Sequence, residues 1–225
     1  FLSEKGIKSP KTELFTSVSD FDKFSRFPLI IKPRFGSGSR NVFVVNDIEE
    51  GTFFCNYLKK YNMEPLIQEY VGDSDSEFTI GILHTKDGKL NSSIAMKRFL
   101  DGDLSTRQIL ISKTSKQKYV VSSGHSQGIF ADFKDIEKMG MEIAKKIDSD
   151  GPLNIQCRKI NDEISVFEIN PRFSGTITAR SLVGHNEPDI FCSYKLFGEI
   201  PAKIDHASGC VMRDFNEKVL SLDKL

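Results

Sequence analysis

Pairs of strand-like segments, each joined by a short turn, restrict what this chain can fold into. Residues 77–83 alternate apolar and polar side chains, residues 86–89 form a turn, and residues 90–99 return as a second strand. Residues 153–160 and 164–169 form another such pair about Asn161-Asp162. Because short turns join neighbouring strands in the antiparallel sense, these segments predict antiparallel sheet.

The remaining segments add more strands and a few helices. A third strand pair, residues 27–32 and 41–45, encloses a glycine- and serine-rich tip at 34–40. Further strands are expected at residues 66–71, 106–112 and 119–122. A helix begins after the cap Asp47 and runs to about residue 60, an amphipathic helix covers 133–147, and helical segments lie at 180–183 and 189–197. The pattern predicts an α+β fold.

Composition excludes several classes of protein. The 31 lysines and arginines are balanced by 31 aspartates and glutamates, so a general nucleic-acid binder is not expected. No apolar run approaches the roughly 18 residues of a membrane span. Four cysteines without a CxxC pair indicate reduced thiols and a cytoplasmic protein. The four histidines show no HExxH spacing, so no zinc site is expected.

The strongest local signal lies at the end of the strand 164–169. Alternation along a strand predicts that Val166, Glu168 and Asn170 share one face, and that Asn154 and Gln156 share a face of the partner strand. If the two strands pair, Gln156 lies near Glu168. Carboxylate and amide oxygens are ligands that hard cations prefer. The alternative is an ordinary polar surface.

A second signal is Lys32, at the end of an apolar strand and just before the glycine-serine tip. A lysine there can meet phosphate oxygens, and the backbone N–H groups of Gly36, Ser37, Gly38 and Ser39 can close over phosphates. The segment is neither a Walker loop nor a dinucleotide fingerprint. The alternative is a simple hairpin tip.

A third signal is the extended segment 68–72, followed by Glu77. A carbonyl at one residue and an N–H two residues later can match the donor and acceptor edge of adenine. The carboxylate of Glu77 can take ribose hydroxyls. Taken alone, the segment is also an ordinary strand, loop and strand.

Several cations are candidates for holding a substrate. Arg98 and Arg107 flank a turn and can form a fork for a carboxylate. Arg172 follows the proline that ends the strand 164–169, and Arg180 lies on the next turn of the chain. His125 is the one histidine that is a candidate for the pocket. The alternative for each arginine is a solvated hairpin end.

In order and content, these segments resemble the ATP-grasp superfamily. The nearest resemblance is to the ATP-binding domains of the carbamoyl phosphate synthetase large chain and to carbamoyl phosphate synthase-like carboxylate–amine ligases. It runs from about residues 6–12 to Phe197, and residues 154–156 with 168–172 are its most specific part. Such proteins normally carry an N-terminal Rossmann-like domain. Its absence, with a first residue that is not Met, predicts that the chain is part of a longer protein.

The resemblance implies a fold and a set of residue roles. Two α+β subdomains, residues 1–68 with the glycine-rich loop and 69–225 with the metal site, would grip ATP between antiparallel sheets. Arg172 would stabilise a phosphoryl group, and Lys32 and Arg107 complete the expected catalytic set. The expected nucleotide-binding residues are Lys32, Gly36, Ser37, Gly38, Ser39, Gln68, Glu69, Tyr70, Val71 and Glu77. The expected metal ligands are Glu168, Asn170 and, more weakly, Gln156.

The resemblance also implies an activity. The expected protein is an ATP- and Mg²⁺-dependent ligase, with Mn²⁺ able to substitute, that joins a carboxylate to an amine through an acyl phosphate. Its partners would be these two small molecules and a second copy of the chain in a homodimer, with no nucleic acid and no membrane. Two alternatives stay open, namely a non-catalytic ATP-binding regulatory or partner subunit and a kinase-like phosphotransferase of the same superfamily.

Overall fold

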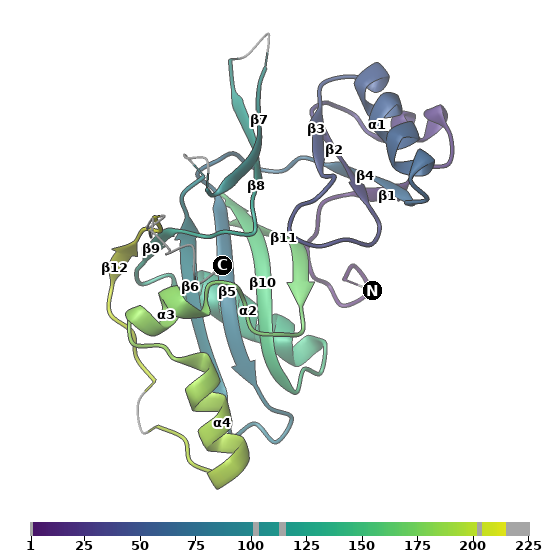
Figure 1. Cartoon of the computed structure of the whole chain (residues 1–225). Helices are drawn as coiled ribbons and strands as arrows, with labels where there is room; N and C mark the ends of the chain where they lie inside the picture. Colours follow the sequence, from purple (N-terminus) through teal and green to yellow (C-terminus); the bar gives the residue numbers. More distant parts are fainter. Residues whose placement is uncertain (1, 101–103, 113–115, 202–203, 215–225) are drawn as a thin grey trace, which may run out of the picture.

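A computed structural model describes residues 2–100, 104–112, 116–201 and 204–214, and within them the chain forms two lobes, each built on an antiparallel sheet (Figure 1). The sheet of the first lobe has the strand order β1-β4-β2-β3 and that of the second has the order β11-β10-β5-β6-β9-β12. Within the described residues every strand pair is antiparallel, which confirms the prediction.

The first lobe is a small sheet covered by one helix. Its elements are β1 (Thr12–Leu14), the 3-10 helix η1 (Val18–Lys23), β2 (Leu29–Pro33), β3 (Phe43–Val45), α1 (Ile48–Lys60) and β4 (Pro65–Glu69). Leu29, Ile31 and Ile67 point from the sheet into a core that also holds Cys55 and Leu58 of α1. Because these side chains face α1, the alternate residues of β2 and β4, such as Lys32 and Gln68, face the second lobe.

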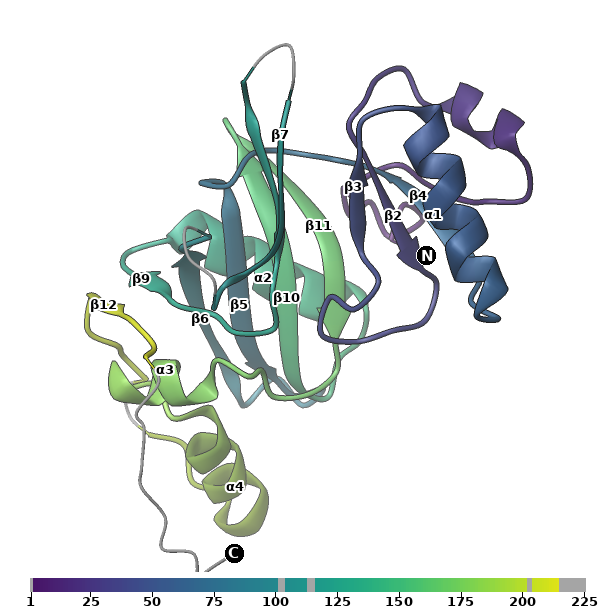
Figure 2. The same cartoon turned by 45° about the horizontal axis from the view of Figure 1, so that its top comes forward.

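The second lobe contains the long strands. Its elements are β5 (Glu77–His84), β6 (Asn91–Arg98), β9 (Gly128–Phe130), α2 (Lys134–Lys146), β10 (Gly151–Ile160), β11 (Glu163–Asn170), α3 (Ile177–Leu182), α4 (Glu187–Phe197) and β12 (Gly209–Val211). The hairpin β7 (Thr106–Ile111) and β8 (Lys118–Ser122) forms a separate two-stranded sheet. Figure 2 shows this hairpin rising beside the first lobe.

Helices cover both faces of the large sheet. On one face α2 packs Ile136 and Ile143 against Ile80 and Ile82. On the other face, Ile190 of α4 packs against Leu83. All eight residues of β5 are therefore buried, although the apolar–polar alternation of this strand resembles that of a half-exposed one.

The start of the chain packs with the second lobe rather than the first. Ile7 is buried in the same core as Ile80 and Ile155, and the backbone N–H of Val166 donates to the carbonyl of Lys8 at 2.9 Å. The division predicted between residues 68 and 69 falls at the end of β4.

No helix in the described part of the chain is both long enough and apolar enough to cross a membrane.

The predicted cap of α1 is present and can be tested. The Asp47 side chain accepts from the backbone N–H of Glu50 at 2.8 Å. We expect Asp47→Ala to lower the free energy of unfolding by about 1 kcal/mol, because one helix N–H loses its partner. Urea unfolding measures this loss. Glu142→Ala on the exposed face of α2 is the control, and an equal loss there would contradict the capping role.

Candidate functional site

A cavity of about 280 Å³ lies between the two lobes. Figure 2 shows the loop between β2 and β3 extending from the first sheet toward β10 and β11, and side chains from that loop and from both sheets line the cavity. The sequence-predicted residues that line it are Lys32, Gly36, Ser37, Gly38, Ser39, Gln68, Glu69, Tyr70, Val71, Glu77, Gln156, Glu168 and Asn170. Segments separated by more than a hundred residues thus meet at one place.

Lys32 is held on the first-lobe side of the cavity. Its Nζ donates to Gln68 Oε1 at 2.8 Å, and Gln68 Nε2 in turn donates to Thr12 Oγ1 at 2.7 Å. Burial lowers the pKa of the Lys32 ammonium, and the charge of Glu168 opposes this effect. A partly desolvated ammonium group on the cavity wall can bind an anionic ligand, because the ligand's negative charge favours the charged form of the lysine.

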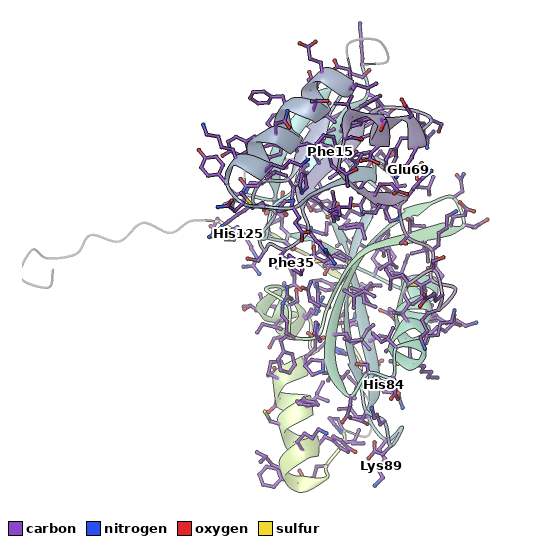
Figure 3. All side chains as sticks on the ribbon, turned by 90° about the vertical axis from the view of Figure 1, so that its right-hand side faces the viewer. Phe15, Phe35, Glu69, His84, Lys89 and His125 are labelled. Carbon is purple, nitrogen blue, oxygen red and sulfur yellow. The ribbon has the colours of Figure 1, made fainter. Side chains whose placement is uncertain are left out.

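The glycine-rich loop reaches the second lobe. Gly38 has a φ of +65° and Ser39 a φ of 55°, so the tip lies in the left-handed region that glycine tolerates best. A Cβ on Gly124 would lie 3.9 Å from the Cα of Gly38. Figure 3 shows Phe35 of the loop and His125 where the lobes meet. The loop therefore forms one wall of the cavity.

Tyr70 and Val71 connect the first lobe to the second. The Tyr70 hydroxyl donates to the carbonyl of Val120 at 3.1 Å and accepts from the Val120 N–H at 2.8 Å. The carbonyl of Val71 accepts from Arg158 Nη1 at 2.9 Å. This linker follows β4 directly and lines the cavity, while its contact with a nucleotide stays a prediction.

Glu77 is buried at the cavity wall and already has partners. Its Oε1 accepts from Arg98 Nη1 at 2.6 Å, and its Oε2 accepts from Arg158 Nε at 3.2 Å and Nη2 at 3.0 Å. Burial alone would raise the pKa of the Glu77 carboxyl, but the two guanidinium groups outweigh it and hold that pKa low. The resemblance implies ribose binding by Glu77, whereas both carboxylate oxygens are engaged by protein in this structure.

The expected metal ligands face the cavity from neighbouring strands. Gln156 lies opposite Glu168 in the β10–β11 register, and Asn170 Nδ2 donates to Glu168 Oε1 at 2.6 Å. The expectation that Val166 shares their face is wrong. The register shifts between Gln156 and Cys157, and this bulge turns Val166 into the core.

The donor set fits a magnesium ion that also binds phosphate. Glu168 supplies one carboxylate, and Asn170 and Gln156 supply amide oxygens. Mg²⁺ commonly takes one or two protein carboxylates and fills its other positions with phosphate and water. Among the described residues, no cluster of three His, Cys, Asp or Glu side chains could hold a metal by itself. These residues therefore suit a metal that arrives with a nucleotide.

The expected substrate anchors lie outside the cavity lining. Arg172 is exposed, and its Nη1 donates to the carbonyl of Phe173 at 3.1 Å. Arg107 is exposed on β7. Arg98 is buried against Glu77, so the expected fork of Arg98 and Arg107 is not formed.

Two further candidates near the anchors also lack a role in the cavity. Arg180 is fully buried and donates to Glu187 at 2.9 Å and to Asn154 at 2.9 Å. His125 is exposed. Neither residue is part of the cavity lining.

Arg158 is a buried cavity residue that the sequence reasoning missed, and Arg34 and Arg40 of the glycine-rich loop also line the cavity without having been predicted. Arg158 lies two residues after Gln156 on the same face of β10, lines the cavity and is 6% exposed. The period of two that selected Asn154 and Gln156 also selects Arg158. Its spacing was therefore the signal that could have identified it.

Comparison with known proteins agrees with this architecture. The model of the family described as ATP-grasp in the biosynthetic pathway with Ter operon matches residues 63–217. N5-carboxyaminoimidazole synthetase from Staphylococcus aureus has a TM-score of 0.62 at 15% identity, over 91% of this chain and 51% of that one. D-alanine–D-alanine ligase from Bacillus anthracis complexed with ATP has a TM-score of 0.56 at 17% identity, over 87% and 62%.

A third solved structure adds to the same picture. Carboxyaminoimidazole ribonucleotide synthase from Aspergillus clavatus complexed with ATP has a TM-score of 0.65 at 13% identity, over 90% of this chain and 50% of that one. At these identities the likeness concerns the fold. This chain spans about half the length of the first of these solved structures.

The family match and the fold are independent observations that lead to one conclusion. The match covers well over half of the chain, and the two-lobed antiparallel architecture is shared with the solved structures. The predicted ATP-grasp fold is confirmed, while the narrower resemblance to carbamoyl phosphate synthetase stays a prediction. The chain belongs to the ATP-grasp family that is described as part of the biosynthetic pathway with the Ter operon.

Proposed function

We propose that this chain carries the nucleotide site of an ATP- and Mg²⁺-dependent ligase that joins a carboxylate to an amine. The observation that supports it is the convergence of Lys32, the glycine-rich loop, the 69–71 linker and Glu168 on one cavity. Each of these has a different task in handling a nucleoside triphosphate. The ligases among the structural neighbours, which share the fold, favour this reaction class.

The cavity offers a place for each part of ATP. Lys32 and the backbone N–H groups of residues 36–39 would meet the phosphates, because both present positive charge to them. The linker with Tyr70 and Val71 would lie along the base. Glu168 and Asn170, with Gln156, would hold Mg²⁺, which when bound would neutralise charge on the phosphate oxygens.

The proposed chemistry proceeds in two displacements. The carboxylate oxygen of the acceptor attacks the γ-phosphorus, the bond to the bridging oxygen breaks, and ADP leaves with that electron pair. The amine then attacks the acyl carbon, and inorganic phosphate leaves with a proton lost from nitrogen. Lys32 would stabilise charge during the first step, and closure of the loop around Gly38 would keep water from hydrolysing the acyl phosphate.

The acceptor would enter beyond Glu168, where β11 ends. Arg172 is the first cation after the metal-ligand strand, and its exposed side chain can turn toward an acyl phosphate. Arg107 is also exposed, near the start of β7 in the small hairpin. The proposal also includes two more specific points, namely that the reaction is of the carbamoyl phosphate synthase type and that the protein forms a homodimer.

Nucleotide binding and turnover test the proposal separately. Calorimetry with Mg-ADP measures binding, and release of ADP and phosphate with panels of carboxylates and amines measures turnover. We expect Lys32→Met to weaken Mg-ADP binding at least about tenfold, since a charge-assisted contact to phosphate is lost. The control is Lys134→Met, whose exposed lysine pairs with Asp132 on the surface.

The products distinguish the proposal from its alternatives. An amide together with ADP and phosphate supports the ligase. A stable phosphorylated product instead indicates a phosphotransferase, and tight Mg-ADP binding without turnover by the complete protein indicates a regulatory subunit. Absence of any nucleotide binding by the unmodified chain would overturn the nucleotide site itself.

A further inference from the structure

Three buried charged residues, two of which line the cavity, form a cluster at its wall, which we call the Glu77 cluster. Glu77, Arg98 and Arg158 lie on the adjacent strands β5, β6 and β10, and are 1%, 1% and 6% exposed. Arg158 lies directly opposite Glu77 in the register. Both arginines bind the one carboxylate, so the cluster carries one excess positive charge.

Arg158 connects the cluster to the linker between the lobes. Besides Glu77, it donates to the carbonyls of Val71 and Val120, each at 2.9 Å. Its guanidinium lies 4.6 Å from the ring centroid of Tyr70, whose hydroxyl also bonds Val120. The position of the linker is thereby tied to Glu77 through a rigid fork of donors.

Arg98 connects the cluster to a second segment of the cavity region. Its Nη2 donates to the carbonyl of Ser123 at 2.9 Å and to that of His125 at 3.3 Å. Gly124 between them is the point that approaches Gly38 of the glycine-rich loop. Arg98 therefore holds the segment against which that loop lies.

Cohesion of the sheet does not require this arrangement. Burying an ion pair costs about as much free energy as the pair returns, and apolar side chains of similar size often serve a fold equally well. Besides its bond to Glu77, each arginine donates to carbonyls of segments that border the cavity. The buried pair of Arg180 and Glu187 on the same lobe differs, because within the part of the chain that the structure describes Arg180 donates to Asn154 and Thr79 of the sheet and not to segments that border the cavity.

We infer that Glu77, Arg98 and Arg158 are positioning residues that set nucleotide affinity by fixing the linker and the 123–125 segment together. This inference rests on the proposed nucleotide site. Glu77 acts as the shared anchor, Arg158 orders the wall along the base, and Arg98 orders the surface that the glycine-rich loop meets. The cluster thus couples the two borders of the cavity through one carboxylate.

Conservative variants of the full chain test the inference. Arg158→Lys and Arg98→Lys keep the charge but lose the fork. We expect each to weaken Mg-ADP binding about tenfold, which corresponds to about 1.4 kcal/mol. Hydrogen exchange separates their effects. Arg158→Lys should speed amide exchange at residues 70–72, and Arg98→Lys should speed it at residues 122–128.

Arg180→Lys is the matched control, because it alters an equally buried ion-paired arginine away from the cavity. We expect it to lower the melting temperature while leaving Mg-ADP affinity within twofold of the unmodified chain. The inference is overturned if Arg158→Lys and Arg98→Lys bind Mg-ADP normally, or if Arg180→Lys loses affinity to the same extent. Failure of the unmodified chain to bind Mg-ADP overturns the proposed function instead.

Discussion

Glu77→Gln is expected to lower the free energy of unfolding by about 3–5 kcal/mol, the usual result of removing one partner from a buried ion pair. The carboxylate of Glu77 is 1% exposed and accepts from Arg98 and Arg158 at 2.6 and 3.0 Å. An amide keeps the shape but leaves two buried guanidinium groups without a counter-charge. Since a domain is stable by only about 5–15 kcal/mol, such a loss is large.

Urea unfolding at neutral pH measures this loss, with Glu13→Gln as the control. Glu13 pairs with Lys23 at 3.1 Å on the surface, and such pairs contribute about 0–1 kcal/mol. If Glu77→Gln unfolded with the same free energy as the unmodified chain, the two arginines would not depend on the charge of Glu77.

The effect of Glu77 should also depend on pH. The two arginines hold its pKa below the ordinary value of 4.5. A carboxyl with a lowered pKa stabilises the fold above its unfolded pKa, and this contribution is lost as the pH falls toward the folded pKa. The difference in unfolding free energy between the unmodified chain and Glu77→Gln should therefore shrink below about pH 4.5. A constant difference down to pH 3 would contradict this assignment.

Features that depend on neighbouring residues were predictable from the sequence. The cap Asp47 and the helix after it follow from local hydrogen bonding. The turn at Asn161, with a φ of 54°, joins β10 and β11 where the polar dipeptide predicts it. The pairing of Gln156 with Glu168 then follows from the hairpin. Most residues that line the cavity lie on strands, hairpins and loops that the sequence pattern predicts from neighbouring residues alone.

Features that depend on contacts between distant segments were not predictable. The partners of Glu77 are 21 and 81 residues away, on strands whose order no single segment encodes. The bulge next to Cys157 depends on how β10 and β11 fit together, so alternation placed Val166 on the wrong face. Arg98 lies in a charged segment at the end of a strand, which is typical of an exposed hairpin end. It is nevertheless buried, and its side chain binds a loop 25 residues away in the sequence.

The largest expected effect on activity comes from Glu168→Gln, which should lower ATP turnover by on the order of 100-fold. Changing a neighbour of a metal ligand already costs about 10–100-fold, and the ligand itself should reach the upper end of that range. Of the three glutamates that line the cavity, Glu77 is neutralised by arginines and Glu69 lies on the linker side. Under the proposed function, Glu168 would therefore supply the negative charge that Mg²⁺ needs beside Asn170.

The geometry makes this substitution a sharp test. Glu168 is exposed, and a glutamine oxygen can still accept from Asn170 Nδ2, so the unfolding free energy should stay within about 0.5 kcal/mol. Turnover measured against Mg²⁺ concentration should need more metal in Glu168→Gln. Glu163→Gln removes a carboxylate from the same strand, where Glu163 pairs with Lys8 on the surface, and should leave the curve unchanged. A normal magnesium response in Glu168→Gln would exclude Glu168 as the ligand.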